Sequence, residues 1–164
     1  MNDDLSKIKG LFSSQLEKHS SLAKSTHGDR KQKLKRLLDN FMSMEQEAID
    51  ALSLDMKKSP TESIISEVLG VKAEADFAIQ NLKKWMRSKR VPSPSTILFT
   101  SGWVRPEPKG SVLILSPWNY PILLCLNPLI AAIASGNTAV IKPCLLYTSP
   151  SPRDRTRSRM PSSA

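Results

Sequence analysis

The first ninety residues repeat apolar side chains with the period of an α-helix. Within residues 3–24 these side chains recur at steps of three and four, which predicts an amphipathic helix. They are Leu5, Ile8, Leu11, Phe12 and Leu16. Gly28 and Asp29 then indicate a break and a new N-cap. We expect a second helix after this break, with one apolar stripe from Leu34 to Leu52 and a charged opposite face.

A clear N-terminal signal predicts a third helix. Ser59, Pro60 and Glu62 fit a capping box with proline at the first helical position. Apolar residues follow at helical spacing, and a cluster of cations at residues 87–90 suits the carbonyl end of the helix dipole, so the helix should end there. Residues 1–90 are therefore predicted to form an N-terminal helical segment.

The pattern changes after the third helix. Residues 91–110 are rich in proline and predict a linker followed by an extended segment. A continuous apolar run at residues 111–115, closed by turn residues, predicts a buried parallel strand. Residues 121–135 suit a helix that Pro128 should kink or divide, and residues 138–141 suit a second buried strand.

Residues 111–143 thus predict strand, helix and strand, with parallel strands and a right-handed crossover. The expected fold class is α/β: N-terminal helices followed by the first βαβ unit of a Rossmann-like cofactor-binding domain, truncated. Ligands of open α/β sheets bind outside the carboxyl ends of the strands, which here are followed by residues 116–119 and by Lys142. The first turn holds Pro117 and Trp118 in place of a glycine-rich fingerprint, so its backbone cannot cradle a pyrophosphate in the usual way.

Composition removes several classes of protein. Two cysteines in 164 residues exclude a disulfide scaffold and a finger-type zinc cage, and we expect no metal site. The longest apolar stretch, residues 122–134, is shorter than the roughly 20 residues that span a bilayer, so we expect no membrane span. The acidic N-terminus has no apolar segment behind it, which argues against a secretory signal and favours a cytoplasmic location.

The net charge of +9 raises the alternative of a basic nucleic-acid-binding protein. Residues 144–164 contribute +3 of it, from four arginines and one aspartate. The basic run at residues 30–36 has no interleaved aromatic residues and is typical of the solvated face of a helix, so we expect no nucleic-acid partner. A non-catalytic helical or nucleotide-binding module is a further alternative.

Two motifs at a fixed mutual spacing carry a specific resemblance. They are Ser116-Pro117-Trp118-Asn119-Tyr120-Pro121, which follows Pro108-Lys109-Gly110 and the apolar run, and Gly136-Asn137-Thr138-Ala139-Val140-Ile141-Lys142-Pro143. Together they resemble the aldehyde dehydrogenase superfamily over roughly residues 5–143. The Trp-Asn-Tyr-Pro form and the three-helix N-terminus are most similar to its class 3-type branch.

This resemblance implies an NAD(P)-dependent enzyme, with NAD or NADP as cofactor, that oxidises an aldehyde to a carboxylic acid through a cysteine thiohemiacetal and a thioester. Asn119 would donate its side-chain amide to the oxyanion, as a preorganised donor at a strand end can do. Lys142 would hydrogen-bond the adenosine ribose, and the backbone of Ser116, Pro117 and Trp118 would line the cofactor cleft. Class 3-type relatives form dimers, so the resemblance implies a homodimer for the complete protein.

The sequence then departs from the family pattern. After Lys-Pro the family usually continues Ser-Glu, but Cys144 and Leu145 follow here. The family's nucleophilic cysteine and general-base glutamate lie downstream and have no counterpart in this chain, and Cys125 is predicted to be a small buried hydrophobe. Residues 144–164 have a disorder-prone composition and look like translated sequencing-adapter DNA. We therefore expect a non-native tail, a natural gene that continues past codon 143, and no activity from this chain alone.

Overall fold

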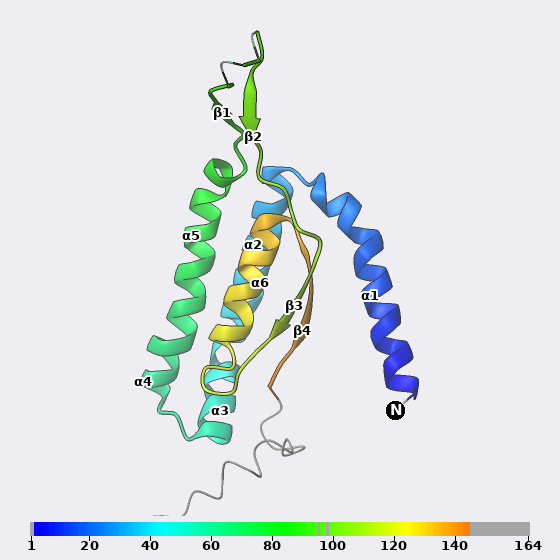
Figure 1. Cartoon of the computed structure of the whole chain (residues 1–164). Helices are drawn as coiled ribbons and strands as arrows, with labels where there is room; N and C mark the ends of the chain where they lie inside the picture. The colour runs from blue at the N-terminus through cyan, green and yellow to red at the C-terminus, as the bar shows by residue number, and fades with distance from the viewer. Residues whose placement is uncertain (1, 95, 98, 145–164) are drawn as a thin grey trace, which may run out of the picture.

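The computed structural model describes residues 2–94, 96, 97 and 99–144. Its elements are α1 (Asn2–Ala23), α2 (His27–Ser43), α3 (Glu45–Met56), α4 (Pro60–Ser63), the π-helix η1 (Ile64–Val68), α5 (Leu69–Trp85), β1 (Lys89–Val91), β2 (Gly102–Val104), β3 (Ser111–Leu115), α6 (Leu123–Ser135) and β4 (Thr138–Lys142). Helices α2, α5 and α6 pack against one another, and strands β3 and β4 contact α6 and α1, between which they lie in Figure 1. The predicted α/β class is confirmed. The tail expected to be disordered lies, from residue 145 onward, outside the described residues.

Two of the predicted helix starts carry side-chain caps. Ser59 accepts a hydrogen bond from the Glu62 N–H at 3.2 Å, with Pro60 in the first turn, as the sequence predicts. The cap of α2 is Thr26 rather than Asp29. Thr26 Oγ1 accepts from the Asp29 N–H at 3.2 Å, and the Asp29 carboxylate accepts from the Thr26 N–H at 2.8 Å, so Asp29 closes the box from the third helical position.

The sequence predictions do not locate the interruptions in the helices. The helix expected after residue 29 divides at Met44, whose φ of −105° and ψ of 14° are not helical. The third helix contains the π segment η1, and Pro128 does not divide α6, which runs from Leu123 to Ser135. A helical repeat of apolar residues in the sequence does not reveal where a single turn of the helix is distorted. At Pro128 packing prevails over proline's preference, because neighbouring Ile130 is fully buried against α5.

The segment between the helices and the βαβ unit forms a hairpin. Strands β1 and β2 pair antiparallel, with Arg90 opposite Trp103. Sequence reasoning placed residues 89 and 90 at a helix terminus because they are charged, so it missed β1; α5 ends at Trp85. Among the described residues of the segment expected to be extended, Gly102–Val104 forms a strand and the others do not.

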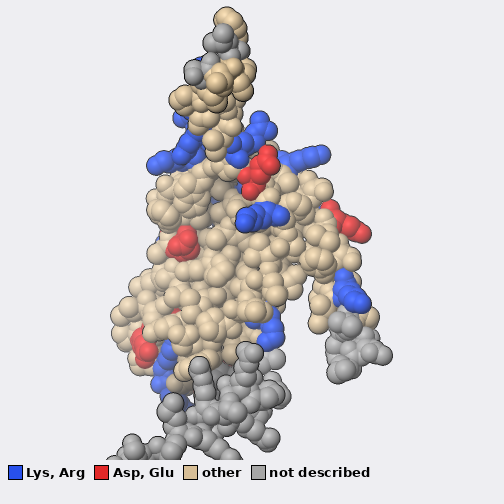
Figure 2. Space-filling view, in the orientation of Figure 1, with Lys and Arg blue, Asp and Glu red and all other residues tan. Residues whose placement is uncertain are grey.

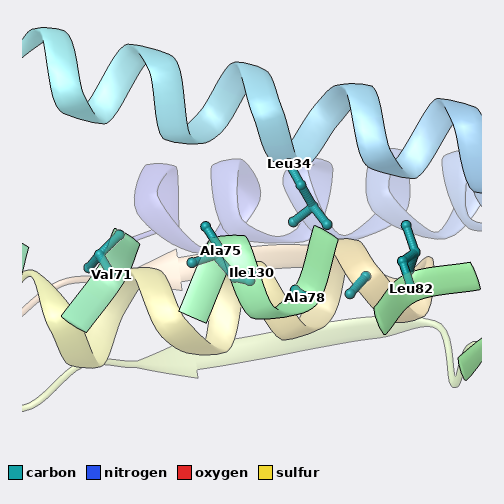
Figure 3. Packing of buried hydrophobic residues seen from close by; sticks show 7 residues of the cluster. Leu34, Val71, Ala75, Ala78, Leu82 and Ile130 are labelled. Atoms are coloured by element: carbon teal, nitrogen blue, oxygen red, sulfur yellow. The ribbon is translucent and has the colours of Figure 1, made fainter. Parts of the chain in front are cut away.

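One cluster of buried residues joins three helices (Figure 3). Its members are Leu34 of α2, Val71, Ala75, Ala78 and Leu82 of α5, and Ile130 and Ala134 of α6. The alanines let the helix axes approach closely, so the branched side chains of neighbouring turns fill the space between them. This cluster fixes α6, and hence the strand ends on either side of it.

Strands β3 and β4 are parallel, as predicted, and their register runs from Ser111 opposite Thr138 to Leu115 opposite Lys142. Their predicted burial is wrong for β3. Ile114 is 4% exposed, but Leu113 and Leu115 are more than 60% exposed. A continuous apolar run is typical of a strand covered on both faces, and the described residues cover one face well.

Helix α1 forms as expected, yet its apolar stripe also stays in solvent. The exposed side chains of this stripe are Ile8, Leu11, Phe12 and Leu16. Among the described residues, none of the helices combines the length and the apolar character that crossing a bilayer requires.

Candidate functional site

The turn after β3 is tied to the end of β4. The Ser116 N–H donates to the Lys142 carbonyl oxygen at 3.1 Å, which extends the parallel ladder by one bond. Ser116 is buried, and its hydroxyl donates to the Pro121 carbonyl oxygen at 3.1 Å, closing the turn on itself. The turn that holds the predicted site residues is therefore fixed at its base.

The remaining candidate residues point outward from this base. Pro117, Trp118 and Asn119 are all exposed, and Lys142 is exposed at the end of the neighbouring strand. The structure thus brings every site residue named from the sequence to one edge of the strand pair, the carboxyl edge. This is the edge at which open α/β sheets bind their ligands.

A buried ion pair lies behind the turn. Lys58 and Glu67 are 8% and 0% exposed, and the Lys58 ammonium lies 2.5 Å from Glu67 Oε1. The same ammonium donates to the backbone carbonyl oxygen of Asn119 at 3.0 Å and lies 4.2 Å from the centre of the Tyr120 ring. The backbone of Asn119 is therefore held by a buried charge.

The second oxygen of Glu67 fastens the other end of the turn. Oε2 accepts from the Ile122 N–H at 2.8 Å and from the Leu123 N–H at 3.3 Å, where α6 begins. A carboxylate is favoured at this end of a helix, whose first N–H groups have no partner within the helix. Sequence reasoning missed this pair, although there was a signal: Glu67 falls on the apolar stripe, between Ile64 and Val71.

The described residues also bear on two other kinds of site, a cysteine nucleophile and a metal centre. Burial raises the pKa of the Cys125 thiol, which keeps it protonated and makes it a poor nucleophile. In the part of the chain that the structure describes, no group of three or more His, Cys, Asp or Glu side chains could hold a metal ion.

A cavity of about 1020 Å³ lies away from this edge. Its lining comes from α1, α2, α5, α6 and the segment after β2, and includes His19, Glu74 and Arg105. It touches neither the turn nor Lys142, so the strand edge remains the candidate site.

Surface charges of both signs are visible in Figure 2. Lys and Arg side chains gather where the hairpin meets the helices, with an acidic side chain among them.

Comparison with known proteins decides between the classes that the sequence left open. A sequence profile of the aldehyde dehydrogenase family matches residues 4–148. The chain belongs to the aldehyde dehydrogenase family. Putative aldehyde dehydrogenase AldX of Bacillus subtilis (strain 168) is 38% identical over 135 residues, which are 82% of this chain and 30% of AldX. Aldehyde dehydrogenase family 3 member B1 of Homo sapiens is 47% identical over 94 residues, 57% of this chain and 20% of that protein.

A solved structure extends this aldehyde dehydrogenase likeness to the fold. The substrate-bound state of Staphylococcus aureus AldH matches with a TM-score of 0.79 and 34% identity, over 84% of this chain and 30% of that one. The chain thus spans less than a third of the length of these relatives. The resemblance to class 3-type aldehyde dehydrogenases is confirmed.

Proposed function

We propose that this chain supplies the oxyanion-binding side of an aldehyde dehydrogenase active site. The observation that carries the proposal is the exposed amide of Asn119, presented at the carboxyl edge of the strand pair by a turn that is fixed at both ends. In the reaction a thiolate adds to the aldehyde carbon, the S–C bond forms, and the carbonyl π electrons move onto oxygen. An amide N–H that already points to that oxygen stabilises the new charge and contributes about 10²–10³ in rate.

The nucleophile and the base come from elsewhere in the enzyme. We assign the cysteine thiolate, and the glutamate that activates water to hydrolyse the thioester, to the two thirds or more of the relatives that this chain does not match. We do not assign this role to Cys125, because burial raises the pKa of its thiol and so disfavours the thiolate. Hydrolysis of the thioester releases the carboxylic acid and regenerates the thiol, and the hydride removed earlier leaves with the reduced nicotinamide.

The residues present suit one end of a nicotinamide dinucleotide. When bound, NAD or NADP accepts the hydride that leaves the aldehyde carbon. The exposed Lys142 ammonium is a donor suited to a ribose hydroxyl, and the backbone of Ser116, Pro117 and Trp118 lies beside it. Pro117 has no N–H, so this turn offers no row of amides to a pyrophosphate, which must be held by other means.

We also propose that the complete enzyme is a cytoplasmic homodimer. The exposed stripe of α1 and the exposed side chains Leu113 and Leu115 form apolar surface of a kind that further chain or a second subunit covers. Cys125 and Cys144 are not paired in a disulfide, which suits a reducing compartment.

Kinetics of a chimera test the proposed role of Asn119. Residues 1–143 replace the matching segment of Staphylococcus aureus AldH, and turnover is followed by the absorbance of reduced nicotinamide. Asn119→Ala should lower kcat by about 10² with little change in cofactor affinity, because the donor acts on the oxyanion. The control is Asn40→Ala, which changes an exposed residue of α2. An unchanged kcat in a folded Asn119→Ala chimera contradicts the proposal.

A further inference from the structure

Two buried charges lie behind the exposed turn and outside the set of residues that face the proposed substrate. Burying a charge is unfavourable unless it is paired and hydrogen-bonded, so the partners of such a pair show what it holds in place. Lys58 has three: Glu67 Oε1 at 2.5 Å, the Asn119 carbonyl oxygen at 3.0 Å and the face of the Tyr120 ring. Two of the three belong to the turn that presents the candidate oxyanion donor.

Glu67 completes this arrangement from the far side of the turn. Helix α6 has no side-chain cap of its own at Ile122, and the Ile122 and Leu123 amides donate to Glu67 Oε2 instead. Lys58 therefore holds Asn119 while Glu67 holds the amides three and four residues later. Since one carboxylate joins both contacts, the segment between them is clamped as a unit.

Local backbone features deliver Glu67 to this position. It lies in the π-helix η1, a distortion that is common at functional sites. Two residues after η1, Gly70 allows α5 to lie close to the start of α6, because a Cβ at Gly70 would lie 2.6 Å from Leu123 Cδ1.

We propose that Lys58 and Glu67 are positioning residues for Asn119. This inference rests on the proposed function of Asn119. The pair fixes the backbone from which the amide projects, so that the donor does not move away when charge develops on the substrate oxygen. Displacements near 1 Å lower rates by on the order of 10², which makes such a clamp consequential.

Backbone dynamics of the full chain test the clamp directly. Lys58→Met removes the donor and keeps most of the side-chain volume, whereas Glu67→Gln keeps the shape and loses the charge. In either variant the ¹⁵N order parameter of Asn119 should fall from about 0.85 to below about 0.6. Amide exchange at Ile122 and Leu123 should accelerate by about tenfold or more in Glu67→Gln.

Two controls separate positioning from general stability. Lys72→Met breaks the exposed Lys72–Asp76 ion pair of α5 and should leave the turn rigid. Lys58→Arg keeps the cation and should retain much of the rigidity. The inference is overturned if Asn119 stays rigid in both Lys58→Met and Glu67→Gln, or if its mobility rises only together with that of the core amides of α5.

Kinetics in the AldH chimera add a readout that a merely structural ion pair would not move. Lys58→Met should lower kcat by about tenfold without raising the KM for the cofactor, and it should lower kcat no further when Asn119 is already alanine. Effects that add in the double variant overturn the inference. A normal kcat in Asn119→Ala alone would instead remove the proposed function and leave the mobility result standing.

Discussion

Gly136 is the residue at which a single methyl group should do the most damage. It ends α6 with a φ of +82°, in the left-handed region, and its N–H is bonded to the Ile133 carbonyl oxygen. A Cβ built there would overlap Nη2 of Arg30. The Arg30 guanidinium is buried, donates to the Ala134 carbonyl oxygen at 3.1 Å and donates to Ser25 Oγ at 2.8 Å, so it has little room to retreat.

The expected loss of stability follows from these two effects. Left-handed backbone disfavours an L-residue by about 1–2 kcal/mol. Displacing Arg30 loses a hydrogen bond from a charged donor, worth about 1.5–3 kcal/mol. Gly136→Ala should therefore lower the free energy of unfolding by roughly 3–5 kcal/mol, a large share of the 5–15 kcal/mol typical of a domain.

Urea unfolding followed by circular dichroism measures this loss. Gly10→Ala is the matched control, because Gly10 lies within α1 with nothing near its missing Cβ, and alanine there should stabilise by about 0.5–1 kcal/mol. Arg30→Met should lose stability alone but recover part of the Gly136→Ala penalty when the two are combined. A Gly136→Ala variant within about 0.5 kcal/mol of the unaltered chain would refute the reasoning.

Two further predictions concern the core and the cap of α2. Leu34→Ala should cost about 2–5 kcal/mol because Leu34 is fully buried, whereas Leu54→Ala, at a site 75% exposed, should stay within about 0.5 kcal/mol, both by urea unfolding. Hydrogen bonds from the Thr26 backbone and side chain lower the pKa of Asp29. The ionised Asp29 therefore contributes to the stability of the folded chain above the usual carboxyl pKa of about 3.9, and this contribution is lost as the pH falls through the lower pKa of the folded state. Asp29→Asn should flatten that part of the acid-stability curve, measured by thermal unfolding between neutral pH and roughly pH 3; an unchanged curve would remove the cap from the account.

Local signals made much of the fold predictable. The helix start at Ser59 and the strand–helix–strand order after residue 110 need only nearby residues, so the sequence carries them. The break at Met44 escaped because the apolar repeat continues across it. The exposure of Leu113 and Leu115 escaped because an apolar run shows what a strand is suited to bury, not what the chain provides to cover it.

The candidate site, like the fold, could be predicted only in part from the sequence. Topology and motif place Asn119 and Lys142 at one edge, and the structure finds both there. The support behind that edge could not be predicted, because Lys58 and Glu67 meet residues more than fifty positions away in the sequence. Glu67 on an apolar stripe was the one local sign that a buried partner exists.

The most direct measurement of the central claim is kcat for Asn119→Asp in the AldH chimera. Aspartate has nearly the shape of asparagine but presents a carboxylate with no N–H to give to an oxyanion. If Asn119 donates to the developing charge, kcat falls by about 10² or more while cofactor affinity is retained. A kcat within about twofold of the unsubstituted chimera would show that the position needs only the shape of the side chain, and would contradict the account.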